Sequence, residues 1–86
     1  MDPRKYLVEF IGTFVFLSVI LTAGEAIPIA IALAAVIFFG GKISGGNFNP
    51  AVSLMMLLKN KLSPIDFFFY ITAQFLGATA AFFFNN

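Results

Sequence analysis

The stretch of sequence that decides the fold is Ser44-Gly45-Gly46-Asn47-Phe48-Asn49-Pro50-Ala51-Val52-Ser53. It is polar and glycine-rich, although the segments on both sides of it are strongly apolar. Asn49 is a residue type that caps helix N-termini, because its side-chain oxygen can accept a free backbone N–H. Pro50 then stands at the first helical position, where its missing N–H leaves nothing unbonded. The stretch therefore predicts a helix that starts at the Asn-Pro-Ala sequence.

The predicted helix is too short to cross a membrane. Its apolar part, residues 51–58, ends in Lys59-Asn60-Lys61, so it covers roughly 12 Å of a hydrocarbon layer that is ~30 Å thick. Such a helix begins or ends near the bilayer centre. Non-helical backbone is tolerated there only where protein buries it or where it lines a water-filled cavity. We expect residues 44–59 to form a re-entrant loop and half-helix that line a path for something polar.

The composition argues against a soluble domain. Of the 86 residues, 60% are hydrophobic and 10% are charged, which leaves too little polar surface to coat a fold of this size in water. The sequence has no cysteine and no histidine, and its four acidic residues are scattered without a nucleophile beside them. We therefore expect no enzyme, no metal and no cofactor. A net charge of +1 gives no reason to expect a nucleic-acid partner, and the expected partner is a lipid bilayer.

Three further segments are long and apolar enough to cross a bilayer as helices. They are residues 6–23, 27–43 and 65–84, which together with the re-entrant stretch make one all-α integral membrane domain over residues 1–86. The alternative for the first segment is a signal peptide. Signal h-regions usually run ~7–15 residues, whereas this segment is longer and carries Glu9, so we favour the membrane span.

The third span has two local signals. Ser63 followed by Pro64 is typical of a helix start. Ala73, Gly77 and Ala81 are spaced by four, which would place small side chains on one face for close contact with another helix. In an alanine-rich segment the same spacing also arises by coincidence.

The basic residues predict an orientation. If the N-terminus is cytoplasmic, two crossings return the chain to the cytoplasmic side at Lys42, and the re-entrant stretch returns to that side at Lys59 and Lys61. All five basic residues, with Arg4 and Lys5, then lie on the cytoplasmic side, as the positive-inside rule favours. A full crossing by residues 51–58 would separate Lys59 and Lys61 from Lys42. We therefore expect a cytoplasmic N-terminus and a C-terminus on the outside.

The polar residues of the stretch favour transport of a neutral solute. The half-helix would aim the positive end of its dipole at the membrane centre, which opposes cations. Asn49 would use its oxygen as the cap and leave its NH₂ group to donate to a permeant oxygen. The N–H groups of residues 45–48 need a buried acceptor, while their carbonyls would face the solute.

Glu9 is the obvious candidate for that acceptor. A carboxyl in mid-span costs on the order of 3 kcal/mol and usually marks function, although Glu9 could instead lie near enough to the interface to be solvated. Gln74, halfway along the third span, either joins helices or binds solute. The remaining hydroxyl residues are expected to satisfy helical carbonyls; they are Thr13, Ser53, Thr72 and Thr79.

Three motifs in this order resemble the aquaporin and glycerol-facilitator family, the major intrinsic proteins. They are residues 44–53, Glu9-Phe10-Ile11-Gly12-Thr13-Phe14 and Ala73-Gln74-Phe75-Leu76-Gly77-Ala78. The resemblance covers essentially the whole chain but only the first half of the family's usual protein. It implies that Asn49, in the motif Asn49-Pro50-Ala51, is the donor at the pore centre. It also implies that Gly46, Asn47 and Phe48 offer carbonyls to the solute and that Glu9, with Gln74, supports the loop.

Two positions depart from the family pattern. Asn47 stands where a histidine is common, so a pH-sensitive imidazole is absent there. Ile29 falls where the family's second span supplies a residue, often aromatic, to the selectivity filter. An aliphatic side chain would leave a wider or less polar constriction.

The family's pore needs two inverted repeats, each of which gives one half-helix to the midplane. The filter arginine and the second Asn-Pro-Ala belong to the repeat that this chain does not contain. Three assemblies stay open: an antiparallel homodimer, a complex with a separate second-half chain, and a parallel homo-oligomer. We expect a channel subunit for water or small uncharged solutes after assembly of two or more chains. The alternative is a non-conducting membrane interaction protein, or a truncated relic, that associates with full-length channel subunits.

Overall fold

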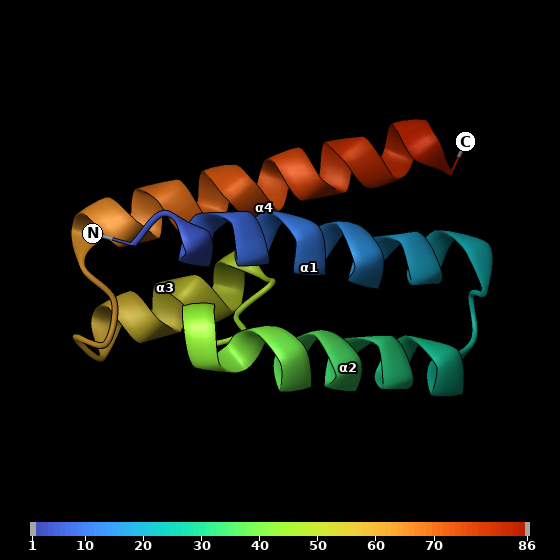
Figure 1. The fold of residues 1–86 in the computed structure, drawn as a ribbon, viewed down its shortest axis with the longest axis horizontal. Coiled ribbons are helices and arrows are strands. Elements are labelled where there is room, and N and C mark those ends of the chain that lie inside the picture. The colour runs from blue at the N-terminus through green and yellow to red at the C-terminus, as the bar shows by residue number, and fades with distance from the viewer. Residues whose placement is uncertain (1, 86) are drawn as a thin grey trace.

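The computed structural model describes residues 2–85 as four helices joined by short connections (Figure 1). They are α1 (Arg4–Thr22), α2 (Ala26–Ser44), α3 (Pro50–Leu58) and α4 (Pro64–Phe84). The helices α1, α2 and α4 have 19, 19 and 21 residues and are apolar enough to cross a membrane, whereas α3 has nine. The all-α prediction and the three membrane-length helices are confirmed, while the re-entrant path of α3 in a bilayer stays a prediction.

The three long helices run side by side along a body of 35 × 23 × 20 Å. The helix α1 lies between α2 and α4 and packs against both, and α3 packs against α4. In Figure 1, α3 starts near the middle of the long axis and ends toward the end of the molecule that holds the N-terminus and the start of α4. The chain thus places the first turn of α3 halfway along its longest dimension.

The predicted helix caps are present. Asn49 has an extended backbone, and its Oδ1 accepts a hydrogen bond of 2.8 Å from the N–H of Ala51, with Pro50 at the first helical position. Ser63 Oγ likewise accepts from the N–H of Asp66 at 3.1 Å at the start of α4. These side chains satisfy N–H groups that a helix N-terminus otherwise leaves free.

Close packing of α1 against α4 depends on the small residues of α4. Ala73, Gly77 and Ala81 are all buried. A Cβ atom on Gly77 would lie 2.7 Å from the carbonyl oxygen of Phe10, closer than real Cβ contacts come. The small-residue face therefore does pack against a helix, and it lets two backbones approach closely.

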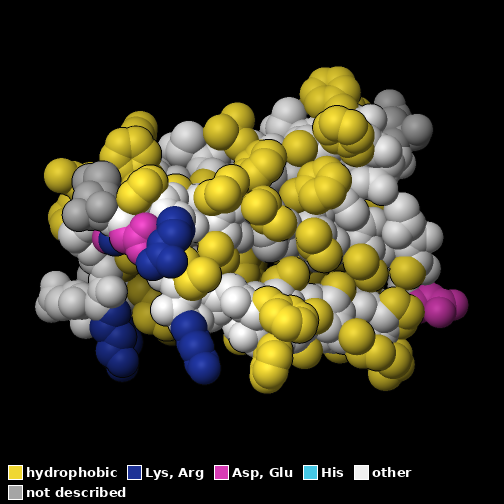
Figure 2. All heavy atoms as spheres, in the orientation of Figure 1, with side chains coloured by type: hydrophobic (Ala, Val, Ile, Leu, Met, Phe, Trp, Pro, Cys, Tyr) yellow, Lys and Arg dark blue, Asp and Glu magenta, His cyan; other side chains and the backbone are white. Residues whose placement is uncertain are grey.

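Polar side chains gather inside the molecule, and large apolar ones lie outside. The buried polar and charged residues are Glu9, Thr13, Ser44, Asn47, Ser53 and Gln74. In contrast, Phe38, Phe39 and Phe84 are about four-fifths exposed, and Figure 2 shows apolar side chains over much of the visible face, with Lys and Arg gathered toward the N-terminal end. Such a surface requires lipid around it, so this is an integral membrane protein.

Candidate functional site

The site is built around the carboxylate of Glu9, which lies on α1 and is completely buried. Its Oε1 accepts from the backbone N–H of Phe48 at 2.7 Å and from Gln74 Nε2 at 2.9 Å. Its Oε2 accepts from Ser44 Oγ at 2.8 Å and from the backbone N–H of Asn47 at 3.0 Å. One side chain of α1 thus holds the end of α2, the loop before α3 and the middle of α4.

Within residues 2–85, the buried carboxyl group of Glu9 is satisfied by hydrogen-bond donors and not by an ion pair. The ion pairs among residues 2–85 join Arg4 to Asp2 and Lys5 to Asp66, near the N-terminal end of the molecule. A carboxylate that accepts four hydrogen bonds uses all of its lone-pair sites. Burial of this acid is therefore tolerated because every acceptor site is filled.

Ser53 extends the network into the first turn of α3. Its Oγ accepts from Gln74 Nε2 and from Asn47 Nδ2, both at 2.9 Å. Tyr70, on α4, also reaches the loop: its hydroxyl donates to the carbonyl oxygen of Ser44 at 2.6 Å. The loop and the start of α3 are consequently fixed to α4 as well as to α1.

Phe48 has an unusual backbone conformation for a bulky residue. Its φ angle is +53°, in the left-handed region that residues with a Cβ seldom occupy. Its ring is buried and lies directly over Gly12 of α1, where an added Cβ would come within 2.5 Å of the ring's Cδ1. The absence of a side chain at Gly12 therefore makes the space that Phe48 fills.

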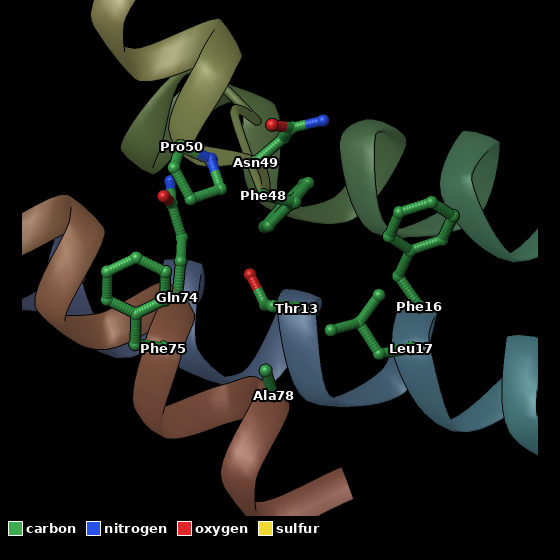
Figure 3. Close-up of a pocket in the computed structure, with 9 residues that line it drawn as sticks. All are labelled: Thr13, Phe16, Leu17, Phe48, Asn49, Pro50, Gln74, Phe75 and Ala78. Carbon is green, nitrogen blue, oxygen red and sulfur yellow. The ribbon is translucent and has the colours of Figure 1, made fainter. Parts of the chain in front are cut away.

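A cavity of about 250 Å³ lies beside the start of α3 (Figure 3). It lies among α1, α4 and the Asn-Pro segment. Its walls are mostly apolar, and three of its residues carry polar side chains. The lining residues are Thr13, Phe16, Leu17, Phe48, Asn49, Pro50, Gln74, Phe75 and Ala78.

The structure brings together some of the residues predicted to form the site and separates others. Phe48, Asn49 and Pro50 line the cavity with Gln74, whereas Gly46, Asn47, Ala51 and Ile29 do not. Asn47 is buried in the network around Glu9, and its amide faces Ser53. Ile29 is half-buried on α2. The roles of these residues toward a solute stay predictions.

Two sequence-based predictions about hydroxyl groups are wrong. Thr72 and Thr79 do donate to helical carbonyls four residues earlier. Ser53, however, accepts from two side-chain amides, and Thr13 Oγ1 has no hydrogen-bond partner within the described residues. Both lie where α1, α3 and α4 converge, so their neighbours come from parts of the chain that a local rule does not consider. The contributions of Ser44 and Tyr70 were missed for the same reason.

Comparison with known proteins identifies the family. The sequence profile described as "Major intrinsic protein" matches residues 2–84. This chain belongs to the major intrinsic protein family. It is 44% identical over 88 residues to the glycerol uptake facilitator protein-like 6 of Lactiplantibacillus plantarum, an alignment that covers 91% of this chain and 40% of the relative.

Two human members of the family also align with this chain. The chain is 36% identical to human aquaporin-9, with 87% of this chain and 30% of the relative covered. It is 38% identical to human aquaporin-5, with 90% of this chain and 34% of the relative covered. No solved structure gives a significant match. The chain spans between 30% and 40% of the length of these major intrinsic proteins.

Proposed function

We propose that this chain is a channel subunit for passive permeation of water or small uncharged solutes, and that it acts after assembly of two or more chains. The observation that carries the proposal is the position of Asn49. Its side chain is exposed at the start of α3, halfway along the molecule, and its oxygen is used by the cap to Ala51. The orientation of the side chain is thereby fixed, and its NH₂ group is directed away from its own helix as a donor for a solute oxygen.

The loop before Asn49 supports the same proposal. The N–H groups of Asn47 and Phe48 are bound by Glu9, and the N–H of Gly46 is bound by Ser44 Oγ at 3.1 Å. With the N–H groups held inside, the carbonyls of this loop are available to a file of solute molecules. Family membership favours the same role, because the relatives are named aquaporins and glycerol uptake facilitators.

The assembly we propose follows from the geometry of one half-helix. Asn49 is exposed, and the cavity beside it is only partly enclosed by α1, α3 and α4. A second set of helices has to close it, either from a second copy or from a chain that resembles the second half of the family. Re-entry of α3 into the bilayer, with the N-terminus in the cytoplasm, would keep Arg4, Lys5, Lys42, Lys59 and Lys61 on one side.

Osmotic shrinkage of proteoliposomes tests the function. Vesicles that contain the wild-type chain should shrink faster than empty ones, and Asn49→Leu should abolish the difference. Asn49→Ser keeps a capping oxygen and should retain a stable α3 with reduced flux. Ser63→Ala is the matched control, because it removes the cap of α4 without touching the cavity. Wild-type vesicles that shrink no faster than empty ones would refute self-sufficient conduction.

Orientation tests the assembly. Tags at both termini, probed with protease in sealed vesicles, report which end faces outward. A single population with the N-terminus inside would exclude an antiparallel homodimer, whereas a mixed population would support it. If the chain by itself is inactive and co-purifies with a full-length channel subunit, the alternative of a non-conducting interaction protein is favoured.

A further inference from the structure

A second cavity lies between α1 and α2 and shares no residue with the cavity beside Asn49. Its volume is about 180 Å³, and it extends over about one and a half turns of each helix. No polar side chain lines it. We call it the α1–α2 groove, and its lining residues are Val8, Ile11, Gly12, Val36, Phe39 and Gly40.

Two buried glycines form the floor of the α1–α2 groove. A Cβ atom on Gly40 would come within 2.6 Å of Val8 Cγ1, and one on Gly12 would overlap the ring of Phe48. The rim is different, because Phe39 is 78% exposed and Ile11 is about half exposed. The groove therefore has a tightly packed floor and an apolar rim that faces outward.

The lining of the groove favours hydrocarbon over water. A bound water needs two to four polar partners, and the side chains of the groove supply none. Both α1 and α2 are long and apolar enough to cross a membrane, so the groove between them faces lipid in this integral membrane protein. An acyl chain is therefore the material that reaches it.

A lysine lies near one end of the groove. Lys42 is in the last turn of α2, three residues after Phe39, and side chains at that spacing are neighbours on a helix surface. In Figure 1, α2 ends toward the same end of the molecule at which α1 begins. Lys42 is exposed and takes part in neither of the ion pairs among residues 2–85. It thus offers an uncompensated positive charge beside the apolar rim.

The other basic residues are engaged elsewhere or belong to another part of the molecule. At the start of α1, Arg4 and Lys5 each form an ion pair with an aspartate. The remaining two lysines follow α3, which packs against α4. Lys42 is therefore the cation that the α1–α2 groove has for a ligand.

We propose that the α1–α2 groove and Lys42 bind one anionic phospholipid. One acyl chain lies in the groove, and the headgroup phosphate accepts a hydrogen bond from the Lys42 ammonium group. Basic side chains beside a membrane helix attract anionic headgroups, and the long stem of lysine lets its charge reach the headgroup region from a helix end. This lipid site does not depend on whether the chain conducts.

Tryptophan fluorescence tests the proposal, because the chain contains no tryptophan. Phe39→Trp places a single reporter on the rim of the groove, where an aromatic ring already lies. In phosphatidylcholine vesicles, phospholipids with brominated acyl chains quench it on contact. Quenching by brominated phosphatidylglycerol and by brominated phosphatidylcholine gives their relative affinity. We expect phosphatidylglycerol to bind at least twofold more tightly. Because the bromine is on the acyl chain, binding of phosphate alone gives no signal.

Leu76→Trp is the matched control reporter. Leu76 is exposed on α4, and the adjacent Gly77 packs against Phe10 of α1, which lies within the part of α1 that lines the groove. The control therefore samples lipid at a similar position along the bundle but away from the groove. We expect the two lipids to quench it equally.

Charge variants locate the headgroup. Lys42→Gln added to Phe39→Trp should remove the preference for phosphatidylglycerol. Lys61→Gln removes the same charge from the segment after α3 and should leave the preference unchanged. Both leaflets of the vesicles have the same composition, so the result does not depend on the orientation of the chain. Far-UV circular dichroism verifies that each variant is folded.

Three results would overturn the proposal. The first is equal affinity of the two lipids at Phe39→Trp, or a preference that survives Lys42→Gln. The second is an equal preference at Leu76→Trp, which would show only a general attraction of anionic lipid to the basic end of the molecule. The third is weak quenching of Phe39→Trp by both lipids with strong quenching of Leu76→Trp, because protein, such as a second copy of the chain, would then cover the groove.

Discussion

Replacement of Glu9 by glutamine preserves the shape of the side chain and removes half of its acceptor capacity. In the wild type, Oε1 binds the N–H of Phe48 and Nε2 of Gln74, and Oε2 binds Ser44 Oγ and the N–H of Asn47. A glutamine has one oxygen and one NH₂ group, so two of these donors would face another donor. Either Phe48 and Gln74 or Ser44 and Asn47 lose their acceptor.

In either orientation of the new amide a neighbouring side chain can restore one hydrogen bond, but at least one backbone N–H stays unbonded. If the NH₂ group replaces Oε2, the hydroxyl of Ser44 can turn and accept from it, but the N–H of Asn47 cannot. If it replaces Oε1, Gln74 can rotate its amide and accept, but the N–H of Phe48 cannot. A buried unsatisfied donor costs ~1–3 kcal/mol. Bonds to a carboxylate are also stronger than bonds to an amide, although a neutral side chain is easier to bury.

We therefore expect Glu9→Gln to lower the free energy of unfolding by about 1–3 kcal/mol. Titration with sodium dodecyl sulfate in maltoside micelles, followed by far-UV circular dichroism, measures it. Glu25→Gln is the matched control, because Glu25 is exposed beside the start of α2, and it should change stability little. A Glu9→Gln variant as stable as Glu25→Gln would refute the inference that the carboxylate holds the loop by its acceptor count.

Two further substitutions test the packing around the loop. Gly12→Ala should destabilise the chain by about 1–3 kcal/mol, because its Cβ would overlap the buried ring of Phe48. The control Gly41→Ala should be neutral or slightly stabilising, because its Cβ would meet its nearest neighbour at an ordinary 3.8 Å. Equal changes in the free energy of unfolding, measured by the same titration, would contradict the role of Gly12. Tyr70→Phe should lower the free energy of unfolding by about 1 kcal/mol, because it removes the hydrogen bond to the carbonyl of Ser44. The rate of amide hydrogen exchange of residues 45–48 should rise. An unchanged rate would argue against Tyr70 as a loop anchor.

The sequence predicted the features that depend on neighbouring residues. The caps at Asn49 and Ser63 were readable because each is encoded within a few residues. The membrane-length helices were readable from runs of apolar residues. Glu9 was identifiable as an acceptor candidate because an acidic side chain within an apolar run is costly to bury and usually marks function.

The features that were not predicted depend on contacts between distant segments. Nothing local to Phe48 indicates a left-handed backbone, which follows from its bond to Glu9 and from the space at Gly12. Thr13 and Ser53 were assigned to helical carbonyls by a rule that considers one helix at a time. Their surroundings come from α1, α3 and α4 together, so only the packed structure shows that one accepts from two amides and the other opens on a cavity.

The polar interior explains how this arrangement is specified in a lipid environment. Lipid tails are as apolar as the outward side chains, so exclusion of water cannot choose which helices pair. Close approach at Gly77 and the bonds of Glu9 can determine the pairing, because they join residues 35 to 67 positions apart in the sequence. The loop obtains its acceptor only when α1, α2 and α4 are in place. The position of Asn49 at the middle of the molecule is therefore a consequence of helix packing, and we expect substitutions in the α1–α4 contact to disturb the Asn49 site without touching it.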